Sequence, residues 1–263
     1  VFVMIAGFFV LFLTGFFLAL PLFDLSFEEL SGLFASGDLS DRLYLLKYFQ
    51  IIQTIGLFVV PPFLIARLYA ERPGQFLGFA SKPKFASVSA VIVSVFVALP
   101  FINFLSHLNQ SIPFPDFLES IEENLISREE DARQMTYHLL DVENVQQLLV
   151  NLFMVAVLPA LGEELLFRGI LQKLFAAWTR NIHWGILIAA VLFSAMHIQF
   201  YGFIPRLFLG MVFGYLFFWS GSIWLPILGH FVNNGSAVVF YYFVGNQRSM
   251  FSGDFETVGS SAF

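Results

Sequence analysis

Three groups of polar residues interrupt long apolar stretches in the C-terminal half of this 263-residue chain. The groups are Glu163, Glu164 and Arg168; Phe193 and His197; and His230 and Asn234. Ionisable side chains within sequence of membrane-spanning composition are costly to bury, and they usually mark function. Carboxylates, imidazoles and an amide can together activate a water and stabilise an oxyanion. The pattern therefore predicts an enzyme whose active site lies inside the lipid bilayer.

The spacing within the first group gives its two carboxylates different roles. Arg168 follows Glu164 by four residues, so the two side chains share one helix face and can form an ion pair. Glu163 points about 100° away from that face. We therefore assign Glu164 and Arg168 to a structural ion pair and Glu163 to catalysis, as a general base. The alternative is a fully structural charge cluster that braces two helices.

The other two groups supply the remaining catalytic candidates. His230 and Asn234 are four residues apart and share a helix face, so their N–H groups could converge on one oxygen, as oxyanion donors must. Phe193 precedes His197 by one turn and is expected to orient it, although ordinary packing also fits. A single histidine on an apolar helix is more often a core residue than a ligand. At a rise of about 1.5 Å per residue, however, Glu163, His197 and His230 lie within about one and a half turns in depth, which favours a shared site.

The composition predicts an integral membrane protein. Hydrophobic residues make up 58% of the chain, charged residues make up 12%, and 36 residues are Phe. A soluble domain of this length has no core large enough to hide so much apolar surface. The net charge of -6 does not indicate nucleic-acid binding, and the absence of Cys excludes disulfides and thiolate chemistry. We expect the protein in a prokaryotic cell membrane.

Seven segments approach the roughly 20 apolar residues that a helix needs to cross a bilayer. We therefore predict an all-α, multi-pass transmembrane bundle with about seven spanning helices. The segments are Val1 to Phe23, Tyr48 to Ala66, Phe85 to Leu105, Leu148 to Phe175, Trp184 to Phe200, Leu207 to Trp219 and Ile223 to Phe243. The length of the first segment favours a retained helix over a signal sequence. Pro159 predicts a kink or break in the fourth, and Gly210 with Gly214 predicts close helix contact by the sixth.

The chain divides into three expected parts within one membrane domain. Residues 1–147 hold N-terminal transmembrane helices and their loops, 148–243 the helical core with the polar groups, and 244–263 a polar tail that we expect to be disordered. Basic residues in the connections 67–84 and 173–183 place both in the cytoplasm. The acid-rich connections 24–47 and 107–147 then fall on the opposite side.

The second acidic connection contains a helical pattern of its own. Leu118, Ile121, Leu125 and Ile126 recur at helical spacing within an otherwise acidic stretch. This pattern predicts a surface helix that rests on the bundle. The sharper alternative is a lid over a substrate entrance.

The three groups also carry a resemblance to a known family. The run from Leu158 to Gly169 closely resembles the first motif, Glu-Glu-x-x-x-Arg, of the CPBP intramembrane proteases, also called CAAX-prenyl proteases or bacteriocin-processing Abi proteins. Phe193 to His197 matches the second motif, Phe-x-x-x-His, and His230 to Asn234 matches the third, His-x-x-x-Asn. The three motifs occur in order and in a membrane context, and the resemblance is specific over about residues 148–243.

The resemblance implies hydrolysis of a peptide bond by a water that Glu163 activates together with His197. His230 and Asn234 would stabilise the oxyanion, and the neighbouring ion pair would support them. The implied partner is a membrane-anchored or lipidated protein or peptide within the bilayer. A prenylated C-terminal motif, a peptide leader or bacteriocin, and an anchored regulator all fit this description.

The resemblance leaves a zinc mechanism open. Members of the family have often been labelled metalloproteases, and Glu163, His197 and His230 could supply three zinc ligands. The chain lacks His-Glu-x-x-His, and Glu164 is the one evident acid that could support such ligands. We therefore favour a glutamate mechanism without metal or other cofactor, with zinc as the alternative.

Two other functions compete with proteolysis. In a proton-coupled carrier, Glu163, Glu164 and the two histidines would form a proton relay, and paired broken helices would be expected. A non-catalytic immunity or scaffold member of the same family would be expected to have lost a motif residue, whereas every motif residue is present here.

Overall fold

A computed structural model describes residues 2–36, 42–112, 117, 119–142 and 144–245. The regular structure within these residues is helical, so the prediction of an all-α protein is confirmed. The expected disordered tail, 244–263, lies outside the described residues except for its first two positions.

The N-terminal helices form a layer that is held together mainly by phenylalanine side chains. Its elements are α1 (Phe2–Leu22), α2 (Phe27–Ser36), α3 (Leu43–Thr54), the π-helical segment η1 (Ile55–Val59) and α4 (Val60–Tyr69). The rings of Phe12, Phe34 and Phe49 meet with centroids 4.9 to 5.8 Å apart. Such ring pairs stabilise beyond their buried area, and here they join α1, α2 and α3. The short α5 (Pro73–Leu77) then leads to α6 (Phe85–Gln110) and α7 (Glu119–Leu140).

One long helical run lies at the centre of the molecule. It extends over 35 residues, Val145–Thr179, as α8 (Val145–Asn151), η3 (Leu152–Val157), α9 (Leu158–Glu164), η4 (Leu165–Leu171) and α10 (Gln172–Thr179). The expected break at Pro159 does not occur. The proline stands in the first turn of α9, directly after the π-helical segment η3. Because π-helical hydrogen bonds span five residues, a widened turn accommodates the proline without interrupting the helix.

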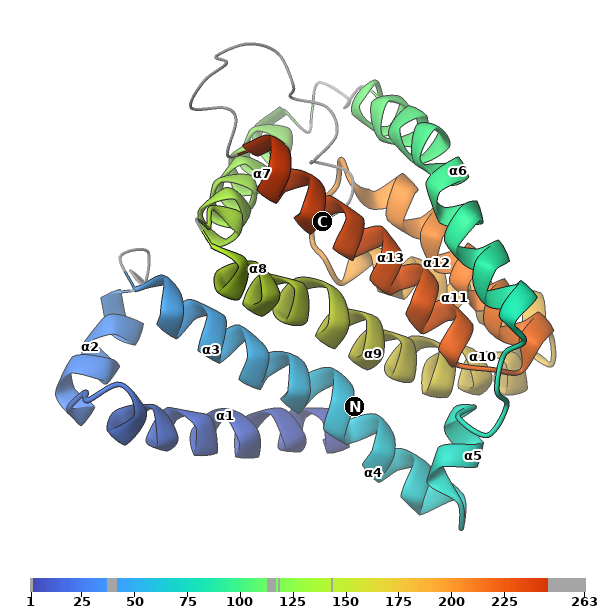
Figure 1. Ribbon diagram of the computed structural model, residues 1–263, viewed down its shortest axis with the longest axis horizontal. Coiled ribbons are helices and arrows are strands. Elements are labelled where there is room, and N and C mark those ends of the chain that lie inside the picture. Colours follow the sequence, from blue (N-terminus) through green and yellow to red (C-terminus); the bar gives the residue numbers. More distant parts are fainter. Residues whose placement is uncertain (1, 37–41, 113–116, 118, 143, 246–263) are drawn as a thin grey trace.

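The C-terminal helices pack on the central run from the side opposite the N-terminal layer. They are α11 (Ile182–Ala195), α12 (Phe203–Ser220), α13 (Trp224–Phe240) and the π-helical segment η5 (Tyr241–Gly245). Helix α11 contacts α10, η4 and α12, and α13 contacts η3, α9, α6 and α12, whereas η1 and α4 approach α9 and η4 from the N-terminal layer. Figure 1 shows the central run between the two groups. The residues from Glu163 to Arg168 are therefore shielded by helices on both sides.

Five helical stretches are long and apolar enough to cross a membrane, which indicates a multi-pass membrane protein. They are Ile5–Leu22, Leu43–Tyr69, Phe85–Gln110, Val145–Thr179 and Phe203–Ser220. The predicted count of seven is not shown. Helix α11 has 14 residues and ends at Ala195, so it falls short of the predicted end at Phe200, and α13 has 17 residues.

All four tryptophans of the chain lie at one end of the C-terminal helices. Trp178 is near the end of α10, Trp184 near the start of α11, Trp219 near the end of α12 and Trp224 at the start of α13. Each is exposed, and Trp224 also donates a hydrogen bond to the carbonyl of Phe79 in the basic connection before α6. Tryptophan is enriched at membrane interfaces. This end of the bundle therefore has the features of an interface, on the side where the basic connections lie.

Single cysteines can test this orientation, because the chain has none. Glu71 and Ser111 lie before and after the 26-residue helix α6. We expect a membrane-impermeant maleimide to label Ser111→Cys in intact cells and to spare Glu71→Cys, since the basic connection should be cytoplasmic. Both variants should be labelled in permeabilised cells. The reverse pattern would show the opposite orientation, and labelling of both in intact cells would show that α6 does not span.

Candidate active site

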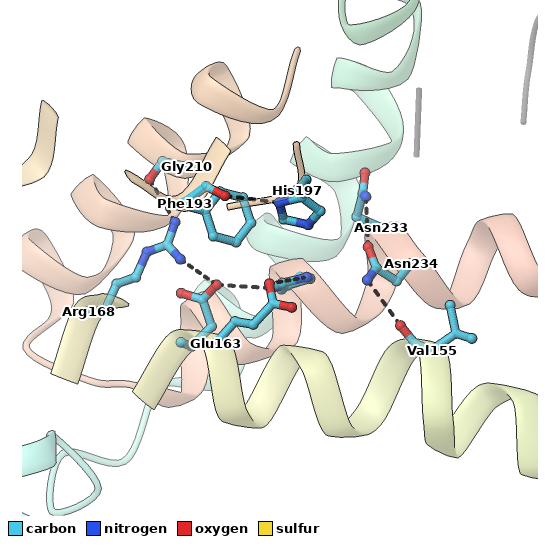
Figure 2. Close-up of polar contacts among 10 residues, drawn as sticks. Val155, Glu163, Arg168, Phe193, His197, Gly210, Asn233 and Asn234 are labelled. Carbon is cyan, nitrogen blue, oxygen red and sulfur yellow. Dashed lines mark hydrogen bonds and ion pairs between the residues drawn. The ribbon is translucent and has the colours of Figure 1, made fainter. Parts of the chain in front are cut away.

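Two opposite charges are buried together beside the central helix. Arg168 Nη1 donates to Glu164 Oε1 over 2.7 Å, and the two residues are only 1% and 0% exposed. Arg168 Nη2 donates to the carbonyl of Gly210 in α12, over 2.8 Å (Figure 2). The guanidinium also lies over the rings of Phe193 and Phe213, 4.9 and 5.5 Å from their centroids. The pair expected from the spacing is thus formed, and it joins η4 to α12.

His230 shares the carboxylate of this pair. Its Nδ1 lies 2.9 Å from Glu164 Oε1, and its buried ring stacks on Phe213 and meets the edge of Phe193. An ionised carboxylate can only accept hydrogen bonds, so Nδ1 carries the proton in this contact. Glu164 Oε1 therefore accepts two hydrogen bonds, one from Arg168 and one from His230, and brings α13 to the same point as α12.

Glu163 is placed differently from its neighbour. It is 9% exposed, and its Oε2 is buried without a hydrogen-bond partner among the described residues. The nearest ionisable partner is His230, whose Nε2 lies 4.0 Å from this oxygen. Buried polar atoms are nearly always hydrogen-bonded, and an exception asks for an explanation. Glu163 Oε2 is thus an acceptor available to a water or a substrate.

His197 lies in a turn rather than on a helix. The prediction that its helix would continue to Phe200 is wrong, because α11 ends at Ala195. His197 Nδ1 lies 2.9 Å from the carbonyl oxygen of Phe193. A carbonyl can only accept, so Nδ1 carries the proton, and Nε2 of the neutral ring is an acceptor. The Phe193 ring packs against the imidazoles of both His197 and His230, and its centroid lies 5.4 and 5.9 Å from theirs.

Asn234 is held by the backbone of the central helix. Its Nδ2 donates to the carbonyl of Val155 over 3.1 Å, and its Oδ1 accepts from Asn233 Nδ2 over 3.1 Å (Figure 2). In an α-helix the Val155 carbonyl would bond to the N–H of residue 159, and Pro159 has none. Asn234 thus donates to a carbonyl to which Pro159 cannot offer an N–H. Asn233, which is not a residue of the three motifs, orients the Asn234 amide through this hydrogen bond.

Two glycines of α12 allow close contact with neighbouring helices, and their carbonyls accept hydrogen bonds from the central run. Arg168 and Gln172 are four residues apart, and they donate to the carbonyls of Gly210 and Gly214, also four apart. A Cβ on Gly210 would lie 3.0 Å from Ala190 Cβ, and one on Gly214 would lie 2.9 Å from Gln172 Oε1. The close helix contact predicted for this glycine pair is confirmed. Gln172 was not identified from sequence, although its spacing from Arg168 signals a shared face.

The geometry does not form the zinc site considered from sequence. Among the residues that the structure describes, no three His, Asp or Glu side chains are placed to hold a metal ion. Glu163, His197 and His230 thus do not make a set of three zinc ligands.

The Arg168 charge should be essential for stability. Arg168→Met would leave the buried Glu164 carboxylate without its cation, which should cost about 3–5 kcal/mol in the free energy of unfolding. Thermal unfolding in detergent micelles measures this loss. Adding Glu164→Gln removes the unpaired charge and should recover part of it. An unchanged unfolding temperature for Arg168→Met would show that Glu164 is not charged in the folded protein.

The C-terminal part of the chain matches a known protein family. Residues 145–236 match the family model of the Rce1-like type II CAAX prenyl endopeptidases, and all three polar groups lie in this range. The chain is also 28% identical over 86 residues to YpbD, an uncharacterized protein of Bacillus subtilis (strain 168); the match covers 31% of this chain and 41% of that relative. No solved structure matches. Residues 145–236 therefore form an Rce1-like domain of the type II CAAX prenyl endopeptidase family, in agreement with the resemblance that the three motifs carry.

Proposed function

We propose that this protein is an intramembrane endopeptidase that hydrolyses a peptide bond in a membrane-associated or prenylated, CAAX-type protein or peptide. The observation that carries the proposal is the buried Oε2 of Glu163, which accepts no hydrogen bond from the described residues and lies 4.0 Å from His230 Nε2. The Rce1-like domain supports proteolysis as the class of reaction.

In the proposed reaction, Glu163 and His197 activate one water. The water donates one hydrogen bond to the carboxylate of Glu163 and one to Nε2 of His197, and its oxygen attacks the carbonyl carbon of the substrate. The proton passes to Glu163, which returns it to the leaving nitrogen as the C–N bond breaks. The hydrogen bond from His197 Nδ1 to the Phe193 carbonyl suits this role, because it leaves Nε2 to accept.

Asn234 and His230 are the proposed oxyanion donors. The Asn234 amide has two N–H groups, and one of them donates to Val155, so the second can donate to the substrate oxygen. His230 gives its Nδ1–H to Glu164. Its Nε2 can donate only when the ring carries a second proton, and the carboxylates of Glu163 and Glu164 would then be its counter-ions.

We place this site within the membrane and retain the prediction of seven spans. The 14 residues of α11 rise about 21 Å, less than the thickness of the hydrocarbon core, so the turn with His197 would lie below the membrane surface. Helix α13 and η5 together run from Trp224 to Gly245, which is long enough to cross. The Bacillus relative agrees with a prokaryotic cell membrane as the location.

Replacement of Glu163 tests the reaction directly. Purified protein in lipid is offered a library of prenylated and membrane-anchored peptides. Glu163→Gln keeps the size of the side chain but cannot take up the proton, so kcat should fall by about 100-fold to 10,000-fold. Glu130→Gln, on the exposed face of α7, is the matched control and should cleave like the wild type.

The same assay separates the alternatives. Cleavage that survives a chelator supports the glutamate mechanism, whereas loss on chelation and recovery with zinc would contradict it. A folded wild-type protein that cleaves nothing in the library would argue for the carrier or the non-catalytic family member.

The two neighbouring asparagines should differ in their effect on the rate. Asn234→Ala removes a proposed oxyanion donor and should lower kcat by about 100-fold to 1,000-fold with little change in KM. Asn233→Ala should lower kcat less, since Asn233 acts by orienting the Asn234 amide. Steady-state kinetics on one cleaved peptide compares them. A larger loss for Asn233→Ala would reverse the assignment.

A further inference from the structure

The turn that carries His197 has an unfavourable backbone conformation. Ile198, directly after the histidine, has a φ of 54°, which is rare for any residue but glycine and an outlier for a β-branched one. Its side chain is 73% exposed, so burial of that side chain does not compensate for the strain. Such a conformation persists only when the surrounding structure imposes it. Contacts of the turn, residues 196–202, must therefore impose this conformation.

The first contact comes from Asn109 in α6. This residue is 1% exposed, and its amide bonds in both directions. Its Nδ2 donates to the carbonyl of Phe200 over 3.0 Å, and its Oδ1 accepts from the N–H of Ile204 over 2.7 Å. Ile204 stands in the first turn of α12, where backbone N–H groups lack partners within the helix. Asn109 thus fixes the end of the turn to the start of α12.

The second contact comes from α7. Glu129 Oε1 accepts from the backbone N–H of Tyr201 over 2.8 Å, and Glu122 Oε1 accepts from its hydroxyl over 3.2 Å. The helix is thus present as predicted. Of the apolar residues at helical spacing, Ile121 and Ile126 are exposed, Leu125 is partly buried and Leu118 lies outside the described residues. Two acidic side chains of α7 make the contact with the turn.

Two further interactions come from the flanking helices. The guanidinium of Arg206, in α12, donates to the backbone and side-chain oxygens of Gln199. A Cβ on Gly202 would lie 2.5 Å from Arg206 Nη1, so the close approach of the guanidinium requires glycine there. Ser194 Oγ, in α11, donates to the carbonyl of Phe203 over 2.6 Å. Side chains from α6, α7, α11 and α12 thus hold one short segment.

We propose that these contacts impose the strained turn so that the His197 imidazole stays at the reacting water, which makes Asn109 and Glu129 positioning residues for the hydrolysis. This inference rests on the proposed function. Asn109 bonds to the third residue after His197 and Glu129 to the fourth. Both therefore act through the backbone of the turn.

Kinetics of the peptide cleavage test the positioning role. Glu129→Leu removes the acceptor for Tyr201 N–H and should lower kcat by about 10-fold to 100-fold, with KM unchanged, because small displacements of a catalytic group cost that much. Glu129→Gln keeps an accepting oxygen and should retain most of the activity. Asn109→Leu should behave like Glu129→Leu. Glu130→Leu, on the exposed face of α7, is the matched control and should match the wild type.

A glycine at the strained position separates a positioning role from a merely structural one, because only a positioning role predicts that it changes the kcat of the Glu129→Leu variant. Glycine adopts a positive φ without steric cost, so Ile198→Gly should lessen the need for the contacts. We expect it to restore part of the kcat that Glu129→Leu loses. Wild-type kcat in both leucine variants, a raised KM at constant kcat, or a further loss on adding Ile198→Gly would each overturn the inference. Because Asn109 is buried and its variant can lose stability, the half-buried Glu129 carries the decisive comparison.

Hydrogen–deuterium exchange separates failure of this inference from failure of the proposed function. Amides of residues 196–202 should exchange faster in Glu129→Leu than in the wild type and the Glu130→Leu control. If Glu129→Leu shows this faster exchange but the wild type cleaves peptides no faster than Glu163→Gln does, the protease function is refuted, and the conclusion that these contacts hold the turn remains supported. A cleaving wild type, with exchange and kcat unchanged in Glu129→Leu, would refute this inference alone.

Discussion

The arrangement of the site depends on the need to pair the buried charges of Glu164 and Arg168. An unpaired buried charge is strongly destabilising, so each group must find partners inside the bundle. Glu164 Oε1 accepts from Arg168 and from His230, and Arg168 also donates to the carbonyl of Gly210. These few bonds fix η4 against α12 and α13 at one point. Glu163 precedes this pair in the chain, and the same packing therefore carries it into the interior.

A second constraint comes from the backbone, because polar groups within a bilayer must be satisfied by the protein itself. Pro159 cannot provide the N–H that the Val155 carbonyl would use in an α-helix. The chain responds with the π-helical segment η3 and with a hydrogen bond from Asn234 to that carbonyl. The position of Asn234 thus answers a structural requirement as well as the proposed catalytic one. The hydrogen bond to Val155 also fixes the plane of the Asn234 amide, and with it the direction of the second N–H.

Sequence reasoning succeeded where the determining interaction was local. The pairing of Glu164 with Arg168 follows from a spacing of four residues, and the all-helical fold follows from long apolar segments. The end of α11 at Ala195 could not be predicted in this way, because the next residues remain largely apolar and the turn is fixed by Asn109 and Glu129, which lie far away in the sequence. The contact between α7 and this turn could not be predicted for the same reason, because Glu129 and Tyr201 lie 72 residues apart in the sequence.

The Rce1-like range, 145–236, contains every side chain that we assign to the reaction, yet Asn109 on α6 and Glu129 on α7, which hold the turn, lie outside it. A hydrogen bond from Asn109 can fix that turn only while α6 keeps its packing against α12 and α13. The geometry around His197 therefore depends on helices that supply no catalytic group. The same reasoning bears on the surface helix α7. Because Glu129 bonds to the backbone four residues after His197, a displacement of α7 would remove one of the contacts that hold the turn, and the position of the imidazole would change with it.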